Sequence, residues 1–236
     1  MTDDTRHRIV FAAMELFWEK GFSSTSIADV LKRSNANSGS LYHFFPGKQD
    51  LLIAVLQMYR TGIHEMLLEP AWSHVADPIE RIFALLARYR QLVVQTECFY
   101  GCPIGSLALE LHEPDPPVRE LLAANFQAWT EAVQRCIVDA GDRLPPRLDS
   151  RELAEFVLTT MEGAVMQSRT FRDVSYFDRS VNQLRKHFDL LVADAAGGAK
   201  TERMTKAKTK TKAKRAKGRA RALSKATKSK RGGRRD

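Results

Sequence analysis

The sequence predicts an all-α protein made of a small N-terminal head, a larger helical bundle and a basic C-terminal tail. Apolar residues recur at helical spacing through most of the chain, and no segment shows the apolar–polar alternation of a half-buried strand. Beyond Gly197 large apolar residues almost vanish, while lysine, arginine, alanine and threonine dominate. We therefore expect a three-helix head over residues 1–47, a helical bundle over residues 48–196 and a disordered basic tail over residues 197–236.

The first two helices of the head follow from apolar spacing and from capping residues. Apolar side chains recur every three or four positions over residues 6–20, and Gly21 ends the pattern. A short second helix is predicted over residues 27–33, because Ser26 and Asp29 have the spacing of a capping box. Each of these helices thus has a local signal for its position.

A third helix of only seven residues is predicted over residues 38–44, ending before the Pro46-Gly47 break. Asn35 suits the left-handed conformation of the preceding turn, and Asn37 suits the cap of the helix. A helix this short is unstable in water by itself, so it must pack on the first two. The residues that we expect to form this small core are Phe11, Leu16, Phe17, Ile27, Val30, Leu31, Leu41, Phe44 and Phe45.

Three short helices with a tight turn between the second and the third make a helix-turn-helix, whose last helix is suited to a DNA major groove. The outer face of this helix carries small residues, which let the backbone at a helix N-terminus approach a phosphate or a base edge. A phenol, an imidazole and a nearby ammonium group add hydrogen-bond donors for phosphate oxygens. The residues of this outer face are Ser38, Gly39, Ser40, Tyr42 and His43, and the ammonium group is that of Lys48, near the start of the next helix.

The segment AMELFWEKGFSSTSIADVLKRSNANSGSLYHFFPGKQDLL is similar to the N-terminal signature of the tetracycline-repressor (TetR) family of transcriptional regulators. The matching elements are A…LF…KG, the TSI entry to the second helix, the LYHFF core of the third, and the GK-x-x-LL opening of the fourth. The resemblance implies a homodimer that binds double-stranded DNA at a near-palindromic operator. It also implies that a small molecule bound to the C-terminal domain releases the DNA.

The resemblance further implies which residues touch DNA. For Thr25 and Ser26, helix capping alone explains the residue types equally well. The DNA-binding residues that we predict are Thr25, Ser26, Asn37, Ser38, Gly39, Ser40, Tyr42, His43 and Lys48.

The bundle is predicted to contain six further helices. Pro78, Pro103 and Pro116 each stand where the first turn of a helix tolerates proline. The apolar residues of the last two helices suit either the core of the monomer or pairing with a second copy, and the resemblance favours a homodimer. The six predicted helices span residues 48–68, 78–96, 103–111, 116–140, 150–172 and 176–194.

The segment FYGCPIGSLALELHEPD resembles a subgroup of these regulators in which a Gly-Cys-x-x-Gly-x-x-Ala-x-Glu stretch enters the sixth helix beside a ligand cavity. The helix over residues 103–111 is apolar nearly all round, which is typical of a buried helix. Aromatic residues and methionines line adaptable apolar pockets, although at helical spacing they more often belong to the core. The candidate residues for an unidentified small-molecule effector are Phe99, Cys102, Phe126, Trp129, Met161 and Met166.

The three cysteines leave two interpretations open. Cys98 and Cys102 would share a face of a helix, and with Cys136 they could sense oxidants or electrophiles. Pro103 would place the Cys102 thiol just before a helix N-terminus, where a thiolate is stabilised. The alternative is that all three are small buried hydrophobic residues. The spacing does not suit a zinc site or a disulfide framework, so no metal is expected.

The sequence also bears on the class of protein and its location. No Ser/His/Asp order, glycine-rich phosphate loop or metal cluster is present, so we expect neither an enzyme nor a cofactor. No apolar run is long enough to span a bilayer, and the N-terminus does not have the pattern of a signal peptide. We expect a cytoplasmic protein associated with the nucleoid and not with a membrane.

The charge of the chain is divided sharply between body and tail. Residues 200–236 hold 17 basic and two acidic residues, a net charge of +15, whereas the rest holds 20 basic and 26 acidic residues, a net charge of −6. The Lys/Ala-rich spacing resembles the tails of linker histones and of some bacterial nucleoid proteins. It implies salt-dependent, sequence-independent contact with DNA phosphates. An anionic membrane is the rival partner, but no amphipathic apolar face accompanies the charge. An architectural DNA-binding protein dominated by this tail is therefore the alternative function.

Overall fold

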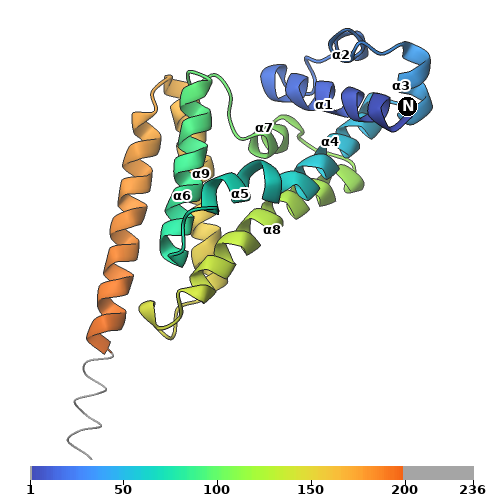
Figure 1. The fold of residues 1–236 in the computed structure, drawn as a ribbon. Coiled ribbons are helices and arrows are strands. Elements are labelled where there is room, and N and C mark those ends of the chain that lie inside the picture. Colours follow the sequence, from blue (N-terminus) through green and yellow to red (C-terminus); the bar gives the residue numbers. More distant parts are fainter. Residues whose placement is uncertain (1, 199–236) are drawn as a thin grey trace, which may run out of the picture. The chain divides into compact units, whose positions relative to one another are not determined.

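The computed structural model describes residues 2–198, and every element in this range is helical. The all-α prediction is therefore confirmed for this part of the chain (Figure 1). The predicted tail lies outside the described residues, apart from Gly197 and Gly198, which belong to the last helix. Within the described residues the chain forms two units, residues 2–141 with 147–188 and residues 142–146 with 189–198.

The helices agree closely with those predicted, with three main differences. The first helix begins four residues earlier, and the last helix runs to residue 198 instead of 194. The predicted helix over residues 48–68 ends in a π-helical turn and continues into a further α-helical turn. The elements are α1 (Thr2–Lys20), α2 (Ile27–Ser34), α3 (Ser38–Phe44), α4 (Lys48–Ile63), the π-helix η1 (His64–Leu68), α5 (Glu69–Trp72), α6 (Pro78–Gln95), α7 (Pro103–Glu110), α8 (Pro116–Asp139), the 3-10 helix η2 (Gly141–Arg143), α9 (Ser150–Phe171) and a last helix over residues 175–198.

Local side-chain bonds fix the helix-turn-helix as the sequence predicts. The Ser26 Oγ accepts a hydrogen bond from the Asp29 N–H at 3.1 Å, and the Asp29 Oδ2 accepts one from the Ser26 N–H at 2.9 Å. Asn35 ends α2 in the left-handed conformation, with φ of 52°. The Asn37 Oδ1 caps α3 by accepting a hydrogen bond from the Ser40 N–H at 2.8 Å. These caps set where each short helix begins and ends.

The head core contains most of the predicted residues, but of the two adjacent phenylalanines only Phe45 is fully part of it. Leu41 is fully buried and Phe45 is 3% exposed, whereas Phe44 is only half-buried. Phe45 leaves α3 in an extended conformation, which turns its ring inward instead of continuing the helical stripe. The placement of Phe11 in this core is wrong, because its side chain is 44% exposed. The other predicted core residues are buried (Leu16, Phe17 and Val30) or half-buried (Ile27 and Leu31).

One acidic side chain of α7 holds the loop between α1 and α2. The carboxylate of Glu110 accepts hydrogen bonds from the N–H groups of Phe22 at 2.8 Å and Ser23 at 2.6 Å. Gly21, with φ of 87°, lets this loop approach closely, since a Cβ there would lie 2.9 Å from the Glu110 Oε2. A second hydrogen bond joins α1 to the residues just before α7, because the Trp18 Nε1 donates to the Gly101 carbonyl at 2.8 Å.

The bundle behind the head is built on α8, which packs along α4, α6 and α9 (Figure 1). Asn125 of α8 is buried, and its amide group donates to the Leu56 carbonyl of α4 at 3.0 Å and to the Leu121 carbonyl at 2.9 Å. A buried amide bonded in this way fixes one helix against another, because leaving it unpaired would cost free energy. α8 thus holds the long helices α4, α6 and α9 together, and α7 packs against it.

We expect Leu41→Ala to lower the free energy of unfolding by about 2–5 kcal/mol, because it removes a fully buried side chain that holds α3 on the head. The matched control is Tyr42→Ala at the next residue, whose side chain is 54% exposed; its effect should stay within about 0.5 kcal/mol. Chemical denaturation measures both changes. Equal losses for the two variants would contradict this account of how the short helix is stabilised.

We expect Glu110→Gln to destabilise the protein at neutral pH and to have less effect in acid. Burial opposes ionisation, but hydrogen bonds from Ser23 and Phe22 and the charge of Lys48 outweigh it and lower the pKa of Glu110. The ionised carboxylate therefore stabilises the fold above the ordinary glutamate pKa of about 4.3, and the benefit is lost as the pH falls through the lower folded value. Denaturation of both proteins between neutral and acidic pH measures the difference, with the exposed Glu113→Gln as control. A difference that does not depend on pH would count against the carboxylate.

Candidate DNA-binding face and ligand cavity

The outer face of α3 presents most of the predicted DNA-binding residues together. Ser38, Gly39, Tyr42 and His43 are exposed, and Ser40 is half-buried. The His43 ring contacts the Phe44 ring edge-on, with centroids 5.0 Å apart, while the residue remains exposed. The small residues of the first turn, the Tyr42 phenol and the His43 imidazole therefore form one continuous surface on α3.

The capping residues divide into two kinds. Ser26 and Asn37 are exposed although their side chains cap α2 and α3, so capping and contact with DNA are compatible for both. Thr25 is different, because its side chain is only 1% exposed. Its hydroxyl donates to the carbonyls of Gly21 at 2.7 Å and Leu16 at 3.3 Å. The Thr25 hydroxyl is therefore bonded within the head, where it fastens the loop to α1.

Lys48 lies beside the loop that Glu110 holds. Its Nζ is 4.3 Å from the centroid of the Phe22 ring and 3.5 Å from the Ser23 carbonyl oxygen. Partial burial lowers the pKa of Lys48, and the charge of Glu110 acts against this shift. The ammonium group thus sits over an aromatic ring at the edge of the head, at the first residue of α4.

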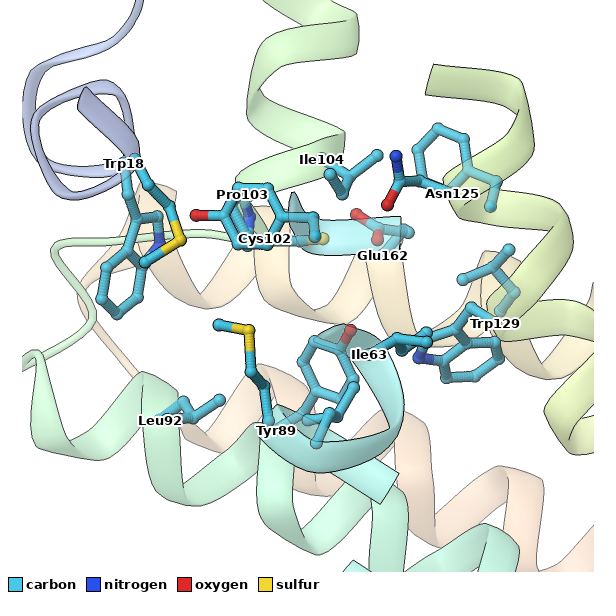
Figure 2. A pocket seen from close by; sticks show the side chains of 16 residues that line it. Trp18, Ile63, Tyr89, Leu92, Cys102, Pro103, Ile104, Asn125, Trp129 and Glu162 are labelled. Atoms are coloured by element: carbon cyan, nitrogen blue, oxygen red, sulfur yellow. The ribbon is translucent and has the colours of Figure 1, made fainter. Parts of the chain in front are cut away.

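The bundle encloses a cavity of about 240 Å³ behind the head. Residues from α1, α4, η1, α6, α7, α8 and α9 line it, and its walls are mainly aromatic and aliphatic (Figure 2). The π-helical turn contributes Met66 and Leu67 to the wall. Figure 2 shows Trp18, Cys102 and Glu162 on one side of the space, with Tyr89 and Leu92 facing them. We call this the inner cavity; it has the apolar character of small-molecule sites.

A second, more open hollow of about 760 Å³ adjoins it along α7 and α9. Cys102, Phe126, Leu158 and Glu162 line both spaces and so form the wall between them. We call this second space the outer groove.

Four of the six predicted effector residues line these spaces. Cys102 and Phe126 line both, Trp129 lines the inner cavity, and Met166 lines the outer groove. Phe99 lines neither: it is exposed, and the Arg172 guanidinium lies 4.0 Å from its ring centroid. Met161 is fully buried and lines neither, so it belongs to the core. The structure thus brings four of the six predicted residues together and places Phe99 and Met161 outside both spaces.

Sequence reasoning missed the most distinctive residue of the cavity, Glu162. The signal was present, because Leu158, Glu162 and Val165 follow one another at helical spacing on the buried side of α9. A carboxyl group on the apolar face of a helix costs free energy unless it has a hydrogen-bond partner, so its presence there points to a partner or a function. The phenols of Tyr59 and Tyr89 were missed as well, since they come from helices that meet the cavity only in the fold.

The Glu162 carboxyl group lies in unusual surroundings. Its Oε1 is buried and has no hydrogen-bond partner among the described residues, and the same holds for the Nε1 of Trp129. Burial raises the pKa of Glu162, and an interaction with the Cys102 thiol partly offsets this rise. α7 passes so close that a Cβ on Gly105 would lie 3.2 Å from the Glu162 Cδ, which explains the glycine at this position.

The cysteines do not have the properties of thiolate sensors. Burial and the nearby Glu162 hold the pKa of Cys102 well above its usual range, although its sulfur accepts a hydrogen bond from the Gly105 N–H at 3.5 Å. The expected stabilisation of a Cys102 thiolate at a helix N-terminus is therefore wrong. Cys98 lies in a turn with φ of 58°, so it does not share a helical face with Cys102, and burial raises its pKa too. Cys136 is buried, and its pKa is raised to about 11.

Two searches of the described residues bear on other kinds of site. No group of three or more potential metal-ligating side chains occurs within residues 2–198. In the same part of the chain, no helix combines the length and the apolar character that crossing a bilayer requires.

Comparison with known proteins agrees with both parts of the molecule. Residues 9–55 match the model of bacterial regulatory proteins of the tetR family, and residues 78–183 match the LmrA/YxaF-like transcriptional regulator C-terminal domain. An HTH-type transcriptional regulator of Mycobacterium tuberculosis, itself uncharacterised, is 34% identical over 80% of this chain and 95% of its own length. The HTH-type regulator YxaF of Bacillus subtilis is 30% identical over 72% of this chain and 87% of its own length.

Solved structures show the same fold at lower identity. A regulatory protein TetR from Rhodobacter sphaeroides has a TM-score of 0.70 and 23% identity, over 77% of this chain and 97% of its own. The reduced form of NemR from Escherichia coli has a TM-score of 0.68 and 20% identity, over 78% and 96% of the two chains. The curated relatives are transcriptional regulators rather than enzymes. The chain belongs to the TetR family of DNA-binding transcriptional regulators.

Proposed function

We propose that this regulator is a homodimeric repressor that binds a near-palindromic operator and releases it when a small molecule occupies the inner cavity. The observation that carries the proposal is the position of α7 between the two sites. Cys102, Pro103 and Ile104 at its start line the inner cavity, and Glu110 at its end holds the loop of the head. A single eight-residue helix therefore touches both the cavity and the DNA-binding unit.

This arrangement suggests how occupancy is sensed. A ligand that moves the first turn of α7 also moves Glu110, because a helix of two turns shifts as one body. The loop over Phe22 and Ser23 must then follow the carboxylate or lose its hydrogen bonds. Either response changes how the head is held on the bundle, which is the coupling between two sites that allosteric release needs.

The DNA contacts that we propose come from α3 and its borders. Residues Ser38 to Ser40 and the caps Ser26 and Asn37 bring backbone and hydroxyl groups to the phosphates. Exposure of Tyr42 and His43 supports a role for their polar tips. The proposed contact residues are Ser26, Asn37, Ser38, Gly39, Ser40, Tyr42, His43 and Lys48.

Dimerisation is proposed through α9 and the helix over residues 175–198. Most apolar residues of α9 are already buried in the monomer, but Phe156, Met166 and Phe171 are exposed. A Cβ on Gly163 would meet no atom within 4 Å, so a second copy can approach the helix there. One recognition helix reads only part of an operator, and a two-fold pair places two of them on adjacent major grooves.

We expect the full-length protein to select a two-fold symmetric sequence from random DNA, and Tyr42→Ala to weaken its binding at least tenfold without loss of stability. Phe11→Ala is the matched control, because Phe11 is a comparably exposed aromatic side chain that faces the groove between α1 and α4 instead. Fluorescence anisotropy with the selected operator measures the affinities. Selection of an asymmetric sequence, or equal effects of the two variants, would overturn the proposed face.

The tail supports a second candidate function, that of an architectural DNA-binding protein. Its net charge of +15 over residues 200–236 suits non-specific contact with phosphates, in which each neutralised phosphate releases counterions. In the repressor proposal the tail adds residence on DNA and aids the search for the operator. In the architectural proposal it dominates binding.

We expect a chain that ends at Gly198 to keep its affinity for the operator within about tenfold and to lose most of its affinity for random DNA at low salt. The slope of log affinity against log salt should also become shallower, by about 0.9 for each phosphate contact removed. Titration of both chains on operator and random DNA at several salt concentrations provides the test. Equal affinity of the two chains for random DNA would rule out the role of the tail, and the absence of operator preference in both chains would favour the architectural function.

A further inference from the structure

The inner cavity contains one acidic group and no basic one. Among the described residues that line it, Glu162 is the only Asp or Glu, and no lysine, arginine or histidine faces the space. The outer groove does contain basic residues, Arg169 and Arg172, but neither forms an ion pair with Glu162 in the described part of the chain. Any charge complementarity inside the cavity must therefore come from a ligand.

The unpaired Oε1 of Glu162 shows what such a ligand must offer. A buried carboxylate oxygen without a donor is unfavourable, because water has been removed and nothing replaces it. A hydrogen-bond donor that carries positive charge satisfies the oxygen and compensates the charge at once, and such charge-assisted bonds are the strong ones. An anionic ligand would instead be repelled.

The walls of the cavity favour the same kind of ligand. Five aromatic side chains line the space, and the faces of such rings attract cations. The remaining lining is mainly aliphatic, which suits an apolar skeleton. The cavity is small, about 240 Å³ against roughly 300–1,000 Å³ for typical drug-sized sites, so the ligand must be compact. The five rings belong to Trp18, Tyr59, Tyr89, Phe126 and Trp129.

We propose that the inner cavity binds a compact organic cation, a protonated amine on an aromatic or other apolar skeleton, whose N–H group donates to Glu162. This inference rests on the proposed function, in which the inner cavity is the effector site.

Binding should strengthen as the pH rises through the titration of Glu162 in the free protein. Burial raises the pKa of Glu162, so the carboxyl must lose a proton before it can pair with the cation. The other titratable groups that face it are Tyr59 from α4, Tyr89 from α6 and Cys102 before α7; α8 contributes none, and Arg169 lines only the outer groove. Burial raises the pKa of all three, so they stay neutral throughout.

The test uses probes that share one ring system and differ in charge. Tryptamine carries an ammonium group, tryptophol has a neutral hydroxyl donor in its place, and indole-3-acetate is an anion. Calorimetry on the full-length protein should show that tryptamine binds at least tenfold more tightly than either of the others, and that its affinity falls as the pH is lowered through the titration of Glu162. The one-ring set of phenethylamine, 2-phenylethanol and phenylacetate repeats the comparison with a smaller skeleton.

Two variants locate the effect. Glu162→Gln keeps the shape and removes the charge, so the preference for tryptamine should fall by about tenfold to a hundredfold while tryptophol binds as before. Glu155→Gln is the control on the same helix, because Glu155 is exposed and pairs with Arg151 at the surface. The proposal is overturned if tryptophol or the anion binds as tightly as the amine, if neither amine binds at millimolar concentration, or if Glu162→Gln keeps the preference.

Release of the operator is measured separately, so that the two proposals fail in different ways. A Glu162-dependent preference for the amine without any release of DNA would refute the ligand-responsive function and leave the ligand class in place. Release of DNA by neutral or anionic compounds that bind the same cavity would refute the ligand class and leave the function in place.

Discussion

The two hydrogen bonds from the Phe22 and Ser23 N–H groups to Glu110 are the interaction on which the rest of the molecule depends. They join a loop of the DNA-binding head to a helix that otherwise belongs to the bundle. An acceptor that satisfies two adjacent backbone donors fixes both the position and the direction of the loop. Without this contact the head would be attached mainly through α4 and through α1, whose Met14 and Trp18 also line the inner cavity.

The same constraint explains the residue types along α7. Cys102 caps the helix and forms part of the cavity wall, Gly105 leaves room for the Glu162 carboxyl, and Glu110 reaches the head. Cys102 and Gly105, three residues apart, both face Glu162, whereas Glu110 reaches the head from the other end of the helix.

The head could be predicted closely from the sequence because its determinants are local. The Ser26–Asp29 capping box and the left-handed Asn35 each act within three or four residues, so spacing reveals them. The prediction for Phe11 was wrong, because helical periodicity shows which side of a helix is apolar but not how much of that side is buried. The cavity was predicted only in part. Phe126 and Trp129 lie on α8, a long helix with a clear apolar side. The surroundings of Glu162 come from α6, α7 and α8, which are distant in the sequence and lie near it only in the folded chain.

The tryptophans have a consequence for observing the protein. The chain has three of them, and two, Trp18 and Trp129, line the inner cavity. Trp18 belongs to the first helix of the head and is bonded to the Gly101 carbonyl beside the cavity, while Trp129 lies in the frame of the bundle. The third, Trp72, donates to the Arg81 carbonyl away from this space. Two of the three tryptophans of the unlabelled protein therefore report on the cavity wall by their intrinsic fluorescence, one from the head and one from the bundle.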